Sequence, residues 1–311
     1  MDLSLVIPVM NEEENLLELY LEIKESLKQS KLQFEIIFVD DGSSDNSVSI
    51  IRDVVHLDRR VHLVQLRRNF GQTAALAAGF ERSTGKVIVA LDADGQNDPQ
   101  DILPLVYELK KGFDCVSGWR RDRKDKPVTR LLPSWIANRM ILWATGIKIH
   151  DSGCTLKAYE GELLRSIPLY GEMHRLIPFY VHLAGGRIGE LEVNHRARTK
   201  GISKYGLTRT FRVIQDVLVA KVQADFARRP MHLFGNIGLT AVILGVLCGI
   251  SSVVLKILSI RDFIQTPLLL IASLFVLMGL QFALSGLIAE IILRRVNLGE
   301  KDRPYSVIAD K

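Results

Sequence analysis

The first two thirds of the chain alternate between short strand-like runs and longer stretches with apolar residues at helical spacing. The helical spacing is clear at Leu16, Tyr20, Ile23 and Leu27, which recur every three or four residues. Strands that alternate with helices predict βαβ units, right-handed crossovers and a mainly parallel sheet, so the expected class is α/β. Five strand-like runs precede polar or charged residues: 3–9, 34–39, 61–66, 87–91 and 113–118.

The last third has a different pattern. Residues 233–255 and 266–289 contain no charged side chain, and each run is long enough to cross a hydrocarbon core of about 30 Å. These runs predict two transmembrane helices; the alternative is a pair of buried core helices. Small residues at Gly245, Gly249 and Gly279 favour close helix packing, either within this hairpin or between subunits.

The distribution of charged residues along the chain is more informative than the net charge, which is only +5. Basic residues precede the first apolar run and follow the second, while the connecting loop holds Lys256 and Arg261 against Asp262. The positive-inside rule therefore predicts that both ends of the hairpin are cytoplasmic. The N-terminus has no signal-peptide pattern, and three scattered cysteines are typical of a reducing compartment. No nucleic-acid partner is expected.

Polar residues gather where the predicted strands end. In a parallel sheet ligands bind outside the carboxyl ends of the strands, so side chains far apart in sequence are expected to meet there. Asp92 and Asp94 can both reach a hard divalent cation such as Mg²⁺ or Mn²⁺, which suits a diphosphate substrate, although a solvated turn is the alternative. Neither a G-x-G-x-x-G nor a P-loop pattern is present. The residues at the strand ends are Asn11, Glu12, Asp40, Asp41, Arg68, Asp92 and Asp94.

Three motifs follow one another in register at the predicted strand ends. They are Val6-Ile7-Pro8-Val9-Met10-Asn11-Glu12, Val39-Asp40-Asp41-Gly42-Ser43 and Leu91-Asp92-Ala93-Asp94-Gly95-Gln96. Together they resemble the motifs of the family 2 glycosyltransferases, which have the GT-A fold. Later residues resemble the polyprenyl-phosphate branch of that family, which includes dolichol-phosphate mannosyltransferases and bacterial bactoprenol glucosyltransferases. The resemblance covers the whole chain and implies inverting transfer of a single sugar.

The resemblance implies a set of donor-binding residues. Pro8, Glu12 and Asp40, with Asp41 beside them, match positions that hold the nucleoside of a nucleotide sugar. The metal and diphosphate positions are matched by Asp92, Asp94 and Gln96, with Asp94 counted as catalytic. The segment 196–205 resembles an R-x-x-G-x-S-K-Y sequence that would close over the diphosphate, and a plain linker is the alternative. Its donor-binding residues would be Arg198, Ser203 and Lys204.

The basic stretch that begins at Trp119 is expected to meet the acceptor. The resemblance implies that Arg120, Arg130 and Ser134 bind the phosphate of a polyprenyl lipid, and arginine suits this because its fork donates two hydrogen bonds. The alternative is a solvated basic face. Asp151 matches an acidic position near the acceptor and is counted as catalytic, but its role as a base stays open, because a lipid phosphate is already anionic.

We therefore expect a GT-A catalytic domain at 1–205, amphipathic juxtamembrane helices at 206–230, two transmembrane helices at 231–293 and a cytoplasmic tail at 294–311. The apolar stripe from Leu207 to Val222 would lie in the membrane interface or pack against protein. The expected partners are a nucleotide sugar, polyprenyl (undecaprenyl) phosphate and the lipid bilayer of the bacterial inner membrane, with a homo-oligomer left open.

The expected donor is UDP-glucose, because Gly171-Glu172-Met173-His174-Arg175 and the two-helix tail resemble the bacterial glucosyltransferases. Transfer from GDP-mannose or from a modified UDP-sugar is the first alternative. A processive polysaccharide synthase is disfavoured, because the sequence lacks a Q-x-x-R-W segment and two spans offer little for a polymer channel. A membrane scaffold without catalytic activity is the third alternative.

Overall fold

The structure, a computed structural model, describes residues 1–121, 149–169, 171, 173–196, 230–260, 262–263 and 266–299. The chain divides into two compact units, Met1–Val219 and Ala220–Lys311. Three expectations fall outside the described residues: the amphipathic helix after residue 206, the acceptor residues Arg130 and Ser134, and the donor residues Arg198, Ser203 and Lys204.

The first unit is built on a seven-stranded sheet with the order β3-β2-β1-β4-β6-β5-β7. Strands β1 (Leu3–Val9), β2 (Phe34–Asp40), β3 (Val61–Gln65) and β4 (Val87–Ala90) pair in parallel, with β1 between β2 and β4. They lie where the apolar runs predicted them. Strands β1, β2 and β4 are buried because parallel strands are covered on both faces, whereas β3, at the edge of the sheet, is partly exposed.

The other half of the sheet contains the one antiparallel strand among those described. Strand β6 (Lys157–Glu160) runs antiparallel to both β4 and β5 (Cys115–Trp119), while β7 (Ile188–Glu192) pairs in parallel with β5. The sequence predicted β5 but neither β6 nor β7. The sheet is nevertheless mainly parallel, as expected.

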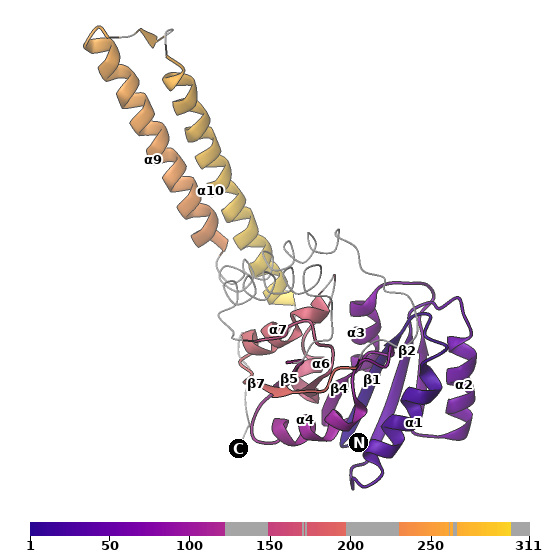
Figure 1. Cartoon of the computed structure of the whole chain (residues 1–311). Coiled ribbons are helices and arrows are strands. Elements are labelled where there is room, and N and C mark those ends of the chain that lie inside the picture. Colours follow the sequence, from indigo (N-terminus) through magenta and orange to yellow (C-terminus); the bar gives the residue numbers. More distant parts are fainter. Residues whose placement is uncertain are drawn as a thin grey trace. The chain divides into compact units, whose positions relative to one another are not determined.

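Helices cover both faces of the sheet (Figure 1). The helices α1 (Leu16–Leu27), α2 (Ser47–Leu57) and α4 (Ile102–Leu109) contribute to one buried cluster with Leu3, Leu5, Ile7 and Val9 of β1. The opposite cluster is formed by α3 (Gln72–Arg82), α6 (Gly161–Arg165) and α7 (Ile177–Leu183). Alternate residues of β1 face these two cores, as a pleated strand requires. The described part of this unit also contains two short 3₁₀ turns, η1 (Pro99–Asp101) and η3 (Met173–Arg175).

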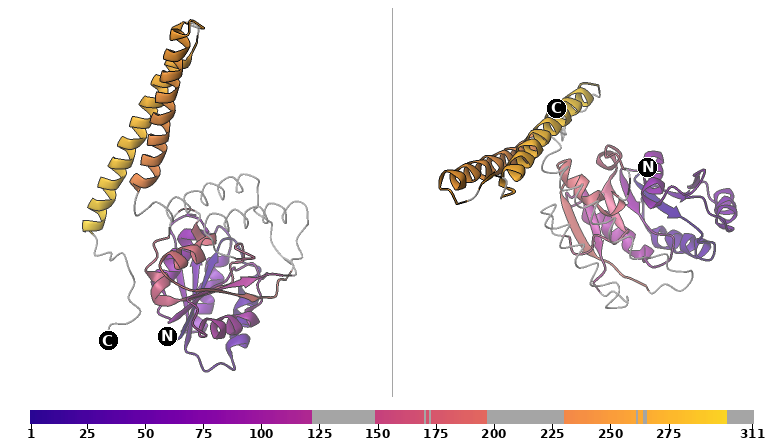
Figure 2. Two further views of the ribbon diagram at one scale, coloured as in Figure 1. Left: turned by 90° about the vertical axis from the view of Figure 1, so that its left-hand side faces the viewer. Right: turned by 90° about the horizontal axis from the view of Figure 1, so that it is seen from above.

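The second unit contains two long helices that run side by side in every view (Figures 1 and 2). Helices α9 (Pro230–Ile257) and α10 (Leu268–Gly299) are apolar over 28 and 25 residues, long enough to form a transmembrane hairpin. A Cβ at Gly279 would lie 2.6 Å from the carbonyl oxygen of Gly238, and one at Gly245 would lie 2.9 Å from that of Ala272. These glycines therefore pack within the hairpin, which was one of the two arrangements that the sequence allowed.

Candidate functional site

The turn that follows β2 is held by two buried aspartates. Asp40 accepts hydrogen bonds from the main-chain N–H groups of Gly42 at 3.3 Å and Ser43 at 3.2 Å. Asp41 accepts from those of Phe70 at 2.7 Å and Gly71 at 2.9 Å. Asp40 thus holds the turn after β2, and Asp41 joins this turn to the segment after β3. Both were predicted to bind the donor, and in the structure both satisfy main-chain donors beside the site.

The turn after β1 is linked to the same region. Pro8 has no main-chain N–H to donate to a neighbouring strand. It is tolerated in the central strand β1 because β4 pairs with β1 only as far as Val6, so β4 has no acceptor opposite Pro8 that would be left without a donor. Glu12 is partly buried and accepts a hydrogen bond from Asn15 Nδ2 at 2.7 Å. Its main-chain N–H donates to Ser47 Oγ at 3.0 Å. Both Pro8 and Glu12 therefore lie at the carboxyl edge of the sheet.

A pocket opens at the same edge, beside the ends of β4 and β5 and the start of β6. Four of the predicted residues line it: Asp92, Asp94, Gln96 and Arg120. Pro8, Glu12, Asp40, Asp41 and Asp151 do not line it. The pocket also contains groups that the motifs did not identify, which are Gln72, Asn97, Ser152, Thr155, Lys157, His174 and Arg175.

The two carboxylates after β4 make the pocket acidic on one side. Gln72 Nε2, at the first residue of α3, donates to Asp92 Oδ1 at 2.8 Å, and the main-chain N–H of Gln96 donates to Asp94 Oδ1 at 3.1 Å. Burial, and next the charge of Asp94, raise the pKa of Asp92 to about 6. Two carboxylates this close repel each other, so a cation between them would stabilise both.

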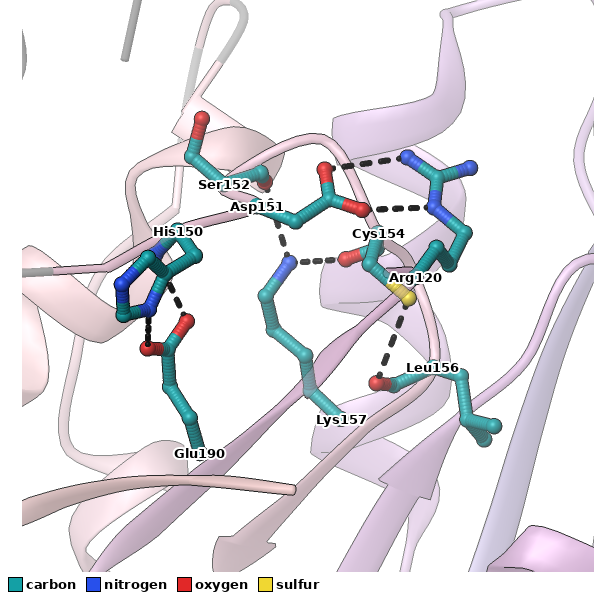
Figure 3. A network of polar contacts seen from close by, with 8 residues as sticks. All are labelled: Arg120, His150, Asp151, Ser152, Cys154, Leu156, Lys157 and Glu190. Atoms are coloured by element: carbon teal, nitrogen blue, oxygen red, sulfur yellow. Dashed lines mark hydrogen bonds and ion pairs between the residues drawn. The ribbon is translucent and has the colours of Figure 1, made fainter. Parts of the chain in front are cut away.

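Arg120, which lines the pocket, forms a buried, bidentate ion pair with Asp151 (Figure 3). Arg120 Nε donates to Asp151 Oδ2 at 2.7 Å, and Nη2 donates to Oδ1 at 3.1 Å. Burial alone would lower the pKa of Arg120, but the hydrogen bonds and charge of Asp151 raise it. Asp151 was predicted as a catalytic residue of open role, and in the structure both of its oxygens bind Arg120.

Lys157 lies close to this pair, and no motif in the sequence identified it as a site residue. Its side chain is 2% exposed, and Nζ donates to the carbonyl oxygens of Ser152, at 3.2 Å, and Cys154. Burial lowers the pKa of Lys157. The segment Cys154-Thr155-Leu156-Lys157 belongs to none of the motifs in the sequence. Lys157 reaches this edge of the sheet only because β6 pairs antiparallel with β4, which the sequence does not reveal.

The far wall of the pocket is formed by η3 and the start of α3. Thr73 Oγ1 and His174 Nδ1 are 2.9 Å apart, and Arg175 lines the same wall. His174 and Arg175 belong to the segment that suggested the sugar, but they were not predicted as site residues. Their place in the pocket makes them candidates for contacts with the donor.

The segment that precedes the predicted donor loop is tied directly to the acidic loop. The main-chain N–H of Arg196 donates to the carbonyl of Gln96 at 2.8 Å, and its guanidinium pairs with Asp98 at 3.0 Å and Glu22 at 2.8 Å. Arg196 therefore joins this loop to α1 and to the chain leading into residues 197–205.

Taken together, these side chains can bind an anionic substrate beside a divalent cation. Over the described residues, no three His, Cys, Asp or Glu side chains form a metal-binding cluster. Asp92 and Asp94 would supply two carboxylate ligands at most, which leaves coordination positions for water and for phosphate oxygens, as Mg²⁺ sites commonly do. Arg120 can bind a second anionic group, because its guanidinium is held in one orientation.

Comparison with known proteins identifies a matching family and relatives that align with nearly the whole chain. The model of the family described as Glycosyl transferase family 2 matches residues 4–167. The chain is 40% identical over 298 residues to dodecaprenyl-phosphate galacturonate synthase from Rhizobium johnstonii, covering 94% of this chain and 88% of that protein. It is 36% identical over 299 residues to undecaprenyl-phosphate 4-deoxy-4-formamido-L-arabinose transferase from Proteus mirabilis, covering 94% and 89%.

Solved structures share the fold of the first unit. The crystal structure of glucosyl-3-phosphoglycerate synthase from Mycobacterium tuberculosis, in complex with Mn²⁺, UDP and phosphoglyceric acid, superposes with a TM-score of 0.54. The identity is 20%, and the match covers 72% of this chain and 78% of that one. A second match, to TarS 1–349 of S. aureus with UDP-GlcNAc, has a TM-score of 0.52 at 17% identity, covering 73% and 68%. The predicted GT-A fold is thereby confirmed.

Proposed function

The chain belongs to glycosyl transferase family 2 and is a transferase, and from this premise we propose that it moves one sugar from a nucleotide donor to polyprenyl phosphate. The observation that carries the proposal is the pocket itself. Asp92 and Asp94 form its acidic wall, and Arg120, which Asp151 holds in a fixed orientation, lines the same pocket. Such a site can hold a diphosphate and a separate phosphate side by side.

In the proposed reaction an oxygen of the lipid phosphate attacks the anomeric carbon of the donor sugar. The bond between that carbon and the diphosphate breaks, the configuration inverts, and the nucleoside diphosphate leaves with the electron pair. Arg120 binds and orients the attacking phosphate, which places the reacting atoms close together. Asp151 orients Arg120 through its two hydrogen bonds. The turns held by Asp40 and Asp41, with Pro8 and Glu12, form the side of the site proposed for the nucleoside.

The acidic wall fits a divalent cation. Burial and the charge of Asp94 raise the pKa of Asp92, so a cation bound between the two carboxylates would relieve their mutual repulsion. Asp92 and Asp94, with the side-chain oxygen of Gln96, are the residues proposed to hold Mg²⁺ or Mn²⁺. A cation bound there would offset the negative charge that develops on the departing diphosphate.

The acceptor and the sugar are proposed from the relatives and from the sequence. Both full-length relatives carry polyprenyl-phosphate acceptors in their names, and the sugars that they transfer are galacturonate and a formamido-arabinose. These names favour a modified sugar over glucose, whereas the segment around His174 suggested UDP-glucose. We therefore propose a UDP-sugar donor, with UDP-glucose as one member of the panel to be tested.

The two apolar helices support a reaction at a membrane. Helices α9 and α10 are long enough to span a bilayer, and basic residues flank their outer ends in the sequence. We propose that the hairpin inserts into the bacterial inner membrane with both ends cytoplasmic, where nucleotide sugars are available. The hairpin would then keep the catalytic domain close to a lipid acceptor.

The test is transfer of radiolabelled sugar by purified full-length protein into undecaprenyl phosphate. The donors are UDP-glucose, UDP-galacturonate, a UDP-formamido-arabinose and GDP-mannose, each with Mg²⁺, with Mn²⁺ and with EDTA. Asp94→Ala is compared with Asp53→Ala, which changes an exposed aspartate of α2 outside the pocket.

We expect metal-dependent formation of a monoglycosylated lipid from one donor, lost in Asp94→Ala and kept in Asp53→Ala. Removal of a metal ligand should lower the rate by roughly a hundredfold or more. A long polymeric product would instead support a processive synthase. The absence of label with every donor would refute transfer, and unchanged activity in Asp94→Ala would refute the role of the acidic wall.

A further inference from the structure

Lys157 is the first residue of β6 and lies at the centre of the carboxyl edge of the sheet. It pairs with Ala90 at the end of β4 and with Ser117 of β5. Its side chain is 2% exposed and lines the pocket. A lysine is rarely buried this deeply unless its amine has hydrogen-bonding partners, because desolvation of the charged group is costly.

The partners of Lys157 are main-chain carbonyls of the turn that immediately precedes β6. Nζ donates to the carbonyl oxygen of Ser152 at 3.2 Å and to that of Cys154 (Figure 3). These contacts draw the two carbonyls towards one point. The shape of the turn therefore depends on the lysine amine.

The same turn is packed closely against β5. The main-chain N–H of Gly118 donates to the carbonyl of Leu156 at 3.0 Å. A Cβ at Gly118 would lie 2.7 Å from that carbonyl oxygen and 3.1 Å from Cys154 Sγ. Even a methyl group at this position would therefore push the turn away from the strand.

Asp151 stands at the start of this turn, one residue before the Ser152 carbonyl that Lys157 holds. Its carboxylate binds the Nε and Nη2 atoms of Arg120 at 2.7 and 3.1 Å. Arg120 in turn lines the pocket. A continuous set of contacts thus leads from Lys157 through the turn to Asp151 and on to the guanidinium.

We propose that Lys157 is a positioning residue for the acceptor phosphate. By holding the carbonyls of Ser152 and Cys154 it fixes the turn that carries Asp151, and Asp151 fixes Arg120 in the orientation that a phosphate group requires. The inference rests on the proposed function in one respect, which is that Arg120 binds the acceptor. It predicts an effect on the acceptor and not on the nucleotide.

The test measures binding of each ligand separately, so that it does not depend on transfer. Full-length protein in detergent with Mn²⁺ is titrated with farnesyl phosphate, a short soluble analogue of the acceptor, and separately with UDP. Lys157→Met keeps the length of the side chain and removes its hydrogen bonds, while Lys157→Arg keeps donors. Gly118→Ala displaces the turn from the opposite side with the lysine intact.

Glu35→Gln is the matched control, because Glu35 is also buried and hydrogen-bonded but contacts Ser4 and Thr84 at the other edge of the sheet. Its substitution should lower the melting temperature and leave both affinities unchanged. This control separates a loss of stability from a loss of positioning.

We expect Lys157→Met and Gly118→Ala to weaken farnesyl phosphate binding by roughly tenfold or more, the scale seen when a supporting side chain behind a ligand is removed, with UDP affinity within about twofold. Lys157→Arg should recover part of the loss. Equal weakening of both ligands, no weakening of either, or no binding of farnesyl phosphate by the wild type would overturn the inference. If the wild type binds farnesyl phosphate but transfers no sugar, the proposed function fails while the positioning role stands.

Discussion

Asp151→Asn tests whether Asp151 orients Arg120 or acts as a base. The substitution keeps the shape of the side chain and removes its charge. In the wild type both carboxylate oxygens accept hydrogen bonds from Arg120, and the two side chains are only 4% and 14% exposed. In the variant the guanidinium would stay buried with one neutral acceptor in place of a carboxylate.

The expected loss of stability follows from this geometry. Two unit charges about 4 Å apart near a protein surface attract each other by about 4 kcal/mol. Removal of one partner of a buried pair costs about 3–5 kcal/mol, and since asparagine keeps an acceptor we expect about 3 kcal/mol. For a domain of roughly 200 residues this corresponds to a fall in Tm of about 6–12 °C. Differential scanning fluorimetry of the purified protein measures it.

The expected kinetic change is a higher KM for polyprenyl phosphate. Arg120 would no longer be held in one orientation, so it would bind the acceptor phosphate less well, while the donor KM should stay within about twofold. A base is not required, because a phosphate monoester is largely ionised at neutral pH. The kcat should therefore keep the pH dependence of the wild type.

The competing role makes a different prediction. If Asp151 removed a proton, Asp151→Asn would lower kcat by about a thousandfold, abolish the acidic limb of the pH–rate profile and leave the acceptor KM nearly unchanged. That combination would refute the orienting role. The matched control is Asp114→Asn, because Asp114 accepts one main-chain hydrogen bond, from Arg187 at 2.7 Å, beside β5 and away from the pocket.

Three further outcomes follow from other parts of the molecule. The hydrogen bond from Arg60, together with its charge, holds the pKa of Asp58 well below its ordinary value of 3.8 despite burial. The ionised pair therefore stabilises the fold above about pH 4, and this contribution is lost as the pH falls further and Asp58 becomes protonated. Asp58→Asn should therefore reduce the difference in Tm between pH 6 and pH 3. Gly279→Leu should force α9 and α10 apart, because a Cβ at this glycine would already lie 2.6 Å from a main-chain oxygen of α9, and a cysteine cross-link between the helices would report the separation. Gln72→Ala removes the amide that donates to Asp92 and should weaken Mn²⁺ binding by roughly tenfold, measured by calorimetry.

The sequence was sufficient to predict the first four strands and the position of the acidic loop. Strands β1, β2 and β4 are buried, largely apolar runs and the edge strand β3 is a shorter one that is partly exposed, so their positions are visible without knowledge of their neighbours. Asp92, Asp94 and Gln96 follow β4, and they lie in the pocket because parallel strands end at the same edge. Arg120 was identified by the family resemblance, and it lines the pocket because it follows β5 at the same edge.

The partner of Arg120 was not predictable in the same way. Asp151 and Arg120 were assigned separate roles, because a motif gives the identity of a residue and not the atoms that it contacts. They are 31 positions apart, and the ion pair exists only because the turn before β6 lies against the end of β5. The hairpin glycines are a similar case: their spacing indicates close packing, but the sequence does not specify the helix against which they pack.

Lys157 is the clearest example of a pocket residue that cannot be found by searching the ends of the predicted strands. That reasoning searches for functional residues after each strand, which is correct for strands that run in the common direction. Strand β6 runs the opposite way, so its first residue, and not its last, lies at the edge where β4 and β5 end. The run Lys157–Glu160 is short and charged at both ends, so nothing in its pattern marks it as a strand. A single reversed strand can therefore place a charged side chain from its beginning in the site, and such a residue becomes visible only once the pairing of the strands is known.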